Sequence, residues 1–316
     1  MEELRKIFRG TMAEMMRENA QVVYLEADLA GALGTTGLFR EFPDQAIDMG
    51  IMEANMIGVA AGMSIKGKIP FVHSFGTFAS RRCADQTFLS GCYNQANLKI
   101  IGSDPGIAAE TNGGTHMPFE DIGVYRSFPE ISILDVDEPY LLKNILKQMA
   151  ENYGVMYLRF PRKGKTTYYS GTEAFTLGKG KIVRDGADAT VIASGIEVGY
   201  ALEAAEKLAR DGLDVRVVDM FTIKPLDEEL VIRCARETGV VVTAENHNIY
   251  GGLGSAVAEV LAENSSALFR RVGVRDTFGE VGSRSFLADK FGISAEYIEK
   301  TVRELSIKKR EMNKRF

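Results

Sequence analysis

The 316-residue chain is long enough for two domains of ordinary size, each with its own hydrophobic core. Hydrophobic residues make up 45% and charged residues 26%, as in globular proteins, and no apolar run reaches the ~20 residues that a membrane-spanning helix needs. The net charge of -5, without a basic stripe before the tail, argues against nucleic acid as a partner.

The first half of the sequence alternates predicted helices and strands. Residues 2–19 have apolar side chains at helical spacing, and 22–29 form the first predicted strand. Further strands are predicted over 69–75, 98–104, 131–136 and 155–160, and helices over 80–95 and 138–152. This alternation predicts an α/β fold with a doubly wound, mainly parallel sheet, whose ligands bind at loops beyond the carboxyl ends of the strands.

A polar, glycine-bearing stretch at 163–181 separates this pattern from a second one. We therefore predict two doubly wound domains, 1–163 and 181–316, joined by a linker over 164–180. The second pattern has strands at 189–195, 214–220 and 239–245 and helices at 197–211 and 226–236. The final run KKREMNKRF predicts a solvated helix end.

Two smaller features of the sequence bear on location and ligands. Gly251, Gly252 and Gly254 resemble a dinucleotide fingerprint, but they follow the third strand of their domain, which favours a close turn into a helix. The three cysteines show neither metal-ligand spacing nor a paired framework. The charged N-terminus has no apolar signal core, so we expect a cytoplasmic protein.

The stretch DMGIMEANMIGVAAG (48–62) predicts a helix that begins near Glu53 and buries one face. An acid at this position has two interpretations. It can be a first-turn residue favoured by the helix dipole, or an acid kept protonated in an apolar pocket so that it donates to a ligand. The stretch by itself favours the first interpretation, and the motifs that follow it favour the second.

Four motifs follow one another in the order and spacing of one family: GIMEANMIGVAAG, HSFGTFASRRCADQ, NGGTHMPFEDIGVYRSFP and YLRFPR. Together they resemble the pyrimidine-binding half of a transketolase, and the resemblance continues through the C-terminal domain. It implies a thiamine-diphosphate-dependent enzyme that transfers a two-carbon ketol unit from a ketose to an aldose. In this family the C-terminal domain builds the dimer more than the active site.

The resemblance assigns cofactor-binding roles to four residues. Glu53 corresponds to the acid that donates to N1′ of the pyrimidine, with hydrophobic neighbours that would keep it protonated. Phe78 matches the aromatic residue that stacks under the ring, and Phe75 is the second choice. Arg81 matches the F-x-x-R spacing of the deoxyxylulose phosphate synthase branch and would lie near the pyrimidine. Core packing of the two rings and a surface position for Arg81 stay open.

The resemblance also assigns the substrate-binding residues. His116 corresponds to a catalytic histidine that faces the reacting end of the sugar, and Arg162 to the arginine that binds the terminal phosphate. Two positions depart from the sugar-phosphate enzymes: Asn112 replaces an aspartate, and Asp104 replaces a phosphate-binding histidine. An acid at 104 would repel a phosphate dianion, so we predict an uncommon phosphosugar or a sulfosugar.

The sequence lacks the G-D-G…N pattern by which this family binds magnesium and diphosphate. We therefore expect Mg²⁺ (or Ca²⁺) and the diphosphate to be held by a separate diphosphate-binding, N-terminal transketolase subunit, in an α2β2 heterotetramer. Three alternatives remain: the beta subunit of a 2-oxo acid dehydrogenase, a deoxyxylulose phosphate synthase, and a non-catalytic scaffold paralogue.

Overall fold

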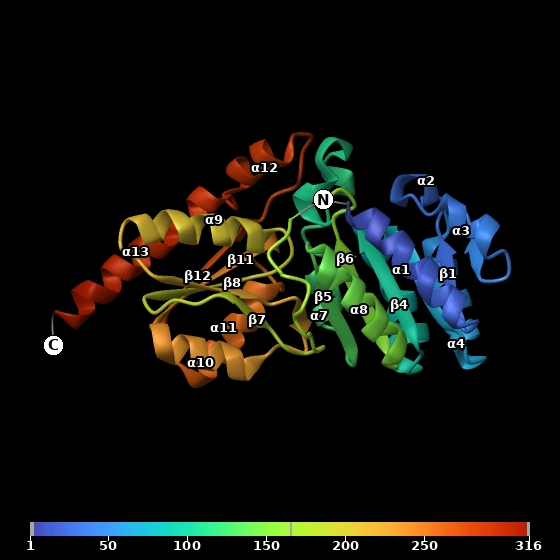
Figure 1. Ribbon diagram of the computed structural model, residues 1–316, viewed down its shortest axis with the longest axis horizontal. Helices are drawn as coiled ribbons and strands as arrows, with labels where there is room; N and C mark the ends of the chain where they lie inside the picture. The colour runs from blue at the N-terminus through green and yellow to red at the C-terminus, as the bar shows by residue number, and fades with distance from the viewer. Residues whose placement is uncertain (1–2, 165, 315–316) are drawn as a thin grey trace.

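The computed structural model describes residues 3–164 and 166–314, so the ends of the predicted first helix and tail, and one position of the predicted linker, lie outside it. Two mainly parallel sheets lie side by side along the longest axis, with helices on their faces (Figure 1). The predicted α/β class is confirmed. Among the described residues, no helix combines the length and hydropathy of a bilayer span.

The first sheet has seven strands, six of them parallel to one another. In spatial order they are β10 (Thr222–Lys224), β5 (Ile131–Asp135), β6 (Val155–Phe160), β4 (Leu98–Ser103), β3 (Ile69–Phe75), β1 (Val22–Glu26) and β2 (Ala46–Asp48). The edge strand β10 runs antiparallel to β5 and comes from the second half of the chain. The second half therefore completes the sheet of the first, which no sequence pattern predicted; the domain limits stay a prediction.

The helices of the first half cover both faces of this sheet. Helices α1 (Leu4–Glu18) and α8 (Pro139–Glu151) pack against each other on one face, and α4 (Glu53–Ile65) and α7 (Asp121–Arg126) contribute to the other. Strand β1 alternates between the two faces: Val22 and Tyr24 belong to one buried cluster, and Val23 and Leu25 to the second. Two short helices, α2 (Ala30–Leu33) and α3 (Thr36–Glu41), follow β1.

The helix predicted over 80–95 is broken into four short turns. They are α5 (Gly76–Ser80), the 3₁₀ turn η1 (Arg81–Cys83), α6 (Ala84–Gln86) and the π-helical η2 (Thr87–Tyr93). The spacing of apolar residues in the sequence does not reveal where one helical type changes into another, so the sequence predicted one continuous helix. Successive side chains of a 3₁₀ turn point about 120° apart, which sends Arg81 and Arg82 in different directions.

The second sheet has five strands, with only β7 antiparallel to its neighbour. In order they are β12 (Leu268–Val274), β11 (Val240–Asn248), β8 (Ala189–Ala193), β9 (Val215–Asp219) and β7 (Lys181–Arg184). Helices α9 (Glu197–Arg210) and α13 (Ala295–Asn313) lie on one face, and α10 (Glu228–Thr238) and α11 (Leu253–Asn264) on the other (Figure 1). Helix α12 (Arg284–Phe291) contacts the 3₁₀ segment η3 (Gly106–Asn112) of the first half.

The glycine-rich start of α11 binds a side chain of the protein itself. The amide of Gly254 donates to Glu245 Oε1 at 3.0 Å. A Cβ atom at Gly252 would lie 2.1 Å from Glu245 Oε2, so this position requires glycine. The carboxyl group of Glu245 occupies the helix N-terminus where a dinucleotide site would place a phosphate, in line with the predicted close turn.

The cysteines pack as small apolar side chains. All three are buried and free: Cys83, Cys92 and Cys234. Burial raises the pKa of Cys83 to about 12 and that of Cys92 to about 11. Their thiolate forms are therefore disfavoured near neutral pH, which fits the packing role expected from the sequence.

Candidate active site

The residues assigned from the motifs gather at the carboxyl edge of the first sheet. Phe75 ends β3, Asp104 directly follows β4, and Arg162 follows β6. Glu53 is the first residue of α4, which comes after β2. Because the carboxyl ends of parallel strands share one edge, residues far apart in the sequence reach one rim.

Two aromatic rings and an imidazole converge at this rim. The ring centroids of Phe78 and His116 are 5.3 Å apart, and those of Phe75 and His116 are 5.8 Å apart, both edge-on. The two phenylalanine centroids are 6.4 Å apart. His116, which ends the 3₁₀ turn η4 (Gly114–His116), has its Nδ1 3.0 Å from Thr115 Oγ1. The structure thus brings together the predicted stacking ring and the predicted catalytic histidine.

Glu53 is buried beside this cluster and has a cationic partner. Its two carboxylate oxygens accept from Arg82 Nη1 at 2.8 and 2.9 Å, and Ser74 Oγ donates to Oε1 at 3.2 Å. The guanidinium carbon of Arg82 lies 4.1 Å from the centroid of Phe78. Glu53 is buried, as the pocket interpretation requires, but its partner is a cation and not an apolar surface, and no sequence pattern indicated this ion pair. Its proton-donating role stays a prediction.

Arg81, which the family spacing points to, contacts a different acid. Its Nε lies 2.8 Å from Glu120 Oε1, and its guanidinium also donates to Thr77 Oγ1. Burial raises the pKa of Glu120, although Arg81 opposes that effect. Arg81 therefore links α5 to the segment that carries His116, while Arg82 is the arginine at Glu53. A cofactor contact of Arg81 stays a prediction.

Asp104 and Arg162 form one unit at the substrate rim. Arg162 Nε lies 2.5 Å from Asp104 Oδ2, and the Arg162 amide donates to Oδ1 at 2.9 Å. The Arg162 guanidinium carbon also lies 4.8 Å from the centroid of Phe75. The predicted repulsion between Asp104 and a phosphate is therefore offset by the neighbouring cation, and Asp104 fixes the position of Arg162. Asn112 is exposed at the end of η3.

A buried hydrogen-bonded chain supports the strand ends beneath the site. His73 Nδ1 lies 2.8 and 2.9 Å from the two carboxylate oxygens of Glu26, and its Nε2 lies 2.9 Å from Ser103 Oγ. Tyr24 donates its hydroxyl to the same glutamate. These side chains join β1 to β3, which ends at Phe75, and to β4, which Asp104 directly follows. His73 is the first residue of the second motif but received no role from it, and its contacts give it a structural role.

Two family models together match most of the sequence. The transketolase pyrimidine-binding domain matches residues 2–165, and the transketolase C-terminal domain matches residues 178–298. The chain belongs to the transketolase family. The resemblance stated from the four motifs is therefore confirmed, and the pyrimidine-binding domain implies thiamine diphosphate as the cofactor.

Relatives of this transketolase-family chain match it over nearly its whole length. The 6-deoxy-6-sulfo-D-fructose transketolase subunit SqwH of Clostridium sp. (strain MSTE9) is 45% identical over 306 residues, 97% of this chain and 95% of that protein. An apulose-4-phosphate transketolase subunit of Phocaeicola vulgatus is 33% identical over 301 residues, 95% of this chain and 96% of that protein. A solved structure described as "Split gene transketolase, inactive beta4 tetramer" has a TM-score of 0.89 at 38% identity, covering 96% of this chain and 98% of that one.

The site residues of this transketolase-family chain fit a pyrimidine. The guanidinium of Arg82 is a planar N–C–N group that lies over Phe78 and donates to Glu53. An aminopyrimidine is also planar and could lie on the same ring face, but its N1′ accepts a hydrogen bond where the guanidinium donates one, so Glu53 would have to supply the proton of that bond. Within the described residues, no group of three or more His, Cys, Asp and Glu is arranged to hold a metal ion.

Proposed function

We propose that this chain is the pyrimidine-binding half of a two-chain transketolase that transfers a two-carbon ketol unit from a ketose with an anionic end to an aldose. The partner chain would hold the diphosphate and Mg²⁺ (or Ca²⁺). The observation that carries the proposal is the meeting of buried Glu53 with Phe78 and His116 at one rim. The full-length relatives are transketolase subunits, which favours ketol transfer over the dehydrogenase and scaffold alternatives.

Glu53 has the position required to control the pyrimidine. Bound thiamine diphosphate supplies the nucleophile and the electron sink of the reaction. Glu53 would place a proton at N1′, while Phe78 holds the ring face. Arg82 must first move away from the Glu53 carboxyl group. Its side chain is 45% exposed and can extend into water. Once Arg82 leaves, the buried Glu53 side chain keeps its contact with Ser74 and can turn its other oxygen toward the ring nitrogen.

His116 and the Asp104–Arg162 pair would receive the substrate. The imidazole of His116 faces the aromatic pocket and can donate to the sugar oxygen on which negative charge develops. Arg162 would bind the anionic end with donors that Asp104 does not engage, and the pair carries almost no net charge. A sulfonate has one negative charge and a phosphate about two, so the pair suits a sulfosugar better than a phosphosugar.

The outer face of α4 supports assembly with further chains. Ile51 and Met52 before the helix, and Val59 and Ile65 on it, are exposed apolar residues. A helix that is apolar all round is typical of a buried position, so this face would be covered by protein. We propose two copies of this chain and two partner chains in an α2β2 heterotetramer. The similar chain described as an inactive beta4 tetramer supports self-association without a partner.

The proposal is tested by co-expression with a diphosphate-binding subunit, followed by a donor screen. We expect ketol transfer from 6-deoxy-6-sulfo-D-fructose to exceed transfer from fructose 6-phosphate. Asp104→Asn should shift the preference toward the phosphate, because Arg162 would then be unopposed. Asp44→Asn, at an exposed position, is the control. An unchanged preference in Asp104→Asn would contradict the substrate assignment, and absence of transfer from every ketose would contradict the function.

A further inference from the structure

The carboxyl end of β11 contacts the segment that carries the substrate-binding residues. Asn246 Oδ1 accepts from the Ile107 amide at 3.0 Å, and its Nδ2 donates to the Pro105 carbonyl at 2.8 Å. The side-chain amide therefore pairs with both sides of Gly106. A Cβ atom at Gly106, whose φ is +50°, would lie 2.1 Å from Asn246 Oδ1, so glycine is required where the amide enters.

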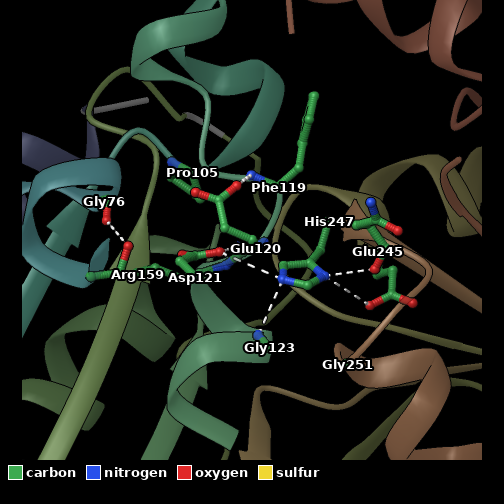
Figure 2. A network of polar contacts seen from close by, with 12 residues as sticks. Gly76, Pro105, Phe119, Glu120, Asp121, Gly123, Arg159, Glu245, His247 and Gly251 are labelled. Carbon is green, nitrogen blue, oxygen red and sulfur yellow. Dashed lines mark hydrogen bonds and ion pairs between the residues drawn. The ribbon is translucent and has the colours of Figure 1, made fainter. Parts of the chain in front are cut away.

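The next residue of β11 contacts the other end of the same segment. His247 Nε2 accepts from the Gly123 amide at 3.3 Å, and Nδ1 donates to the Asn248 carbonyl at 2.6 Å. Figure 2 shows the imidazole between Gly123 and Asp121 on one side and Glu245 on the other. Burial lowers the pKa of His247 to about 4, so the ring is neutral and holds one tautomer near neutral pH.

The two contacts bracket residues 105–123, which include Asn112 and His116. Within the segment, Glu110 has φ 47° and ψ -112°, a conformation that is strained for a residue with a side chain. Arg284 of α12 lies 3.6 Å from the Glu110 carboxylate. The second half of the chain thus contacts the segment at both ends and at its strained centre.

We propose that Asn246 and His247 are positioning residues that fix the His116 segment for the ketose. The inference rests on the proposed function, since it assigns a role within that reaction. The hydrogen bonds and ion pairs of the two side chains go to residues 105–123, Glu245 and Asn248, while the candidate cofactor residues Glu53 and Phe78 lie on other elements. The C-terminal half therefore determines substrate binding as well as assembly, which differs from the role that the family resemblance implied for it.

The first test compares Asn246→Ala with Asn248→Ala. Asn248 is the same residue type on the same strand, but its side chain accepts from the amide of Tyr250 in its own turn. In the full chain, Asn246→Ala should speed hydrogen exchange over 105–116 by roughly tenfold or more, because two buried hydrogen bonds are lost. With the partner present, KM for the ketose should rise and kcat fall, while thiamine diphosphate affinity stays unchanged. Asn248→Ala should behave like the wild type in every measurement.

The second test keeps the inference open to refutation if Asn246→Ala does not fold. His247→Gln retains an acceptor for the Gly123 amide, and His247→Leu does not. Faster exchange over 119–123 and a raised KM in the Leu variant, both restored in the Gln variant, are expected. Wild-type exchange and KM in Asn246→Ala, or in His247→Leu, would overturn the inference. A wild-type enzyme without ketol transfer would refute the proposed function, and the exchange rates would still show whether these side chains fix the segment.

Discussion

Two carboxylate–arginine pairs of this molecule differ in what surrounds the arginine. In the Asp121–Arg159 pair both side chains are fully buried, with Nη1 and Oδ1 2.6 Å apart. In the Glu53–Arg82 pair the carboxylate is 2% exposed and the arginine 45% exposed. If Arg159 moved away, the charge of Asp121 would stay buried without a cation, whereas Arg82 can move its guanidinium into water. The Asp121–Arg159 pair is therefore a fixed part of the fold. In the Glu53–Arg82 pair a ligand can replace the arginine, so Arg82 is an exchangeable partner of Glu53.

The buried pair belongs to a network that joins the two halves of the chain. Arg159 also contacts Asp135 at 3.2 Å and donates to the carbonyl of Asn246 at 2.9 Å. Tyr157 donates its hydroxyl to Asp121 at 2.7 Å. Burial disfavours the charged guanidinium, yet Asp121 and Asp135 hold the pKa of Arg159 above its ordinary value. This network anchors α7, the helix whose first turn ends the His116 segment.

Removal of the fixed arginine should have the largest effect on stability. Arg159→Leu leaves Asp121 and Asp135 unpaired, and should lower the free energy of unfolding by about 3–5 kcal/mol. The control is Arg270→Leu, which breaks an exposed pair with Glu304 and should cost at most about 1 kcal/mol. Urea denaturation of the full chain measures both. Equal losses in the two variants would show that burial does not distinguish these pairs.

Substitution of Glu53, the acid of the pair with the exchangeable arginine, should affect turnover and not stability. Glu53→Gln keeps the shape of the side chain but cannot provide a proton at N1′, so kcat of the reconstituted enzyme should fall by at least about 100-fold. Stability should change little. Glu41→Gln, in an exposed pair with Arg17, is the matched control. Turnover close to that of the wild type in Glu53→Gln would refute the assignment of Glu53.

Loss of the exchangeable arginine should improve cofactor binding slightly. Arg82→Gln removes a competitor for Glu53, and thiamine diphosphate should bind about two- to fivefold more tightly, as expected for a partly exposed pair. Arg17→Gln, which breaks an exposed pair with Glu41, is the control and should leave the affinity unchanged. Calorimetric titration in the presence of the partner chain measures both. Weaker binding by Arg82→Gln would mean that Arg82 supports the cofactor.

The interior around the fixed pair should make stability depend on pH. Burial raises the pKa of Glu245 to about 8 and that of Asp219 to about 7. The native state therefore binds more protons than the unfolded state, and stability falls as pH rises toward these values. The fall begins above the ordinary carboxyl pKa values of about 4 and ends near pH 7 for Asp219 and near pH 8 for Glu245, and within its window each acid contributes a slope of up to about 1.4 kcal/mol per unit. Glu245→Gln should flatten the dependence measured by thermal or urea denaturation; an unchanged slope would contradict this.

The sequence predicted strands over 69–75 and 155–160 with the bounds that the structure shows, because each is a short apolar run with clear flanks. It could not predict β10, since a three-residue antiparallel edge strand has no period to detect. Motif spacing located Glu53, Phe78 and His116 at one rim. Motif spacing does not indicate contacts between residues that are far apart in the sequence.

The partners of the motif residues show why part of the site could not be predicted. Arg82 follows Glu53 by 29 residues, and Asn246 follows Ile107 by 139. The sequence identified Asp104 as a departure from the family and predicted that it would repel a phosphate. Its ion pair with Arg162, 58 residues later, offsets that repulsion. A motif shows which charged residues are present in a site. Only the folded structure shows which residue of opposite charge lies beside each of them.

The most direct test of the two-chain assignment is calorimetric titration of thiamine diphosphate and Mg²⁺ onto the purified chain, alone and with its diphosphate-binding partner, combined with an assay of ketol transfer. The pyrimidine pocket of this chain offers stacking and a few hydrogen bonds, while diphosphate and metal usually add oxygen ligands and backbone donors. We predict weak binding and no transfer by the chain alone, and tight binding with transfer when the partner is present. Tight binding and ketol transfer by this polypeptide alone would contradict the assignment.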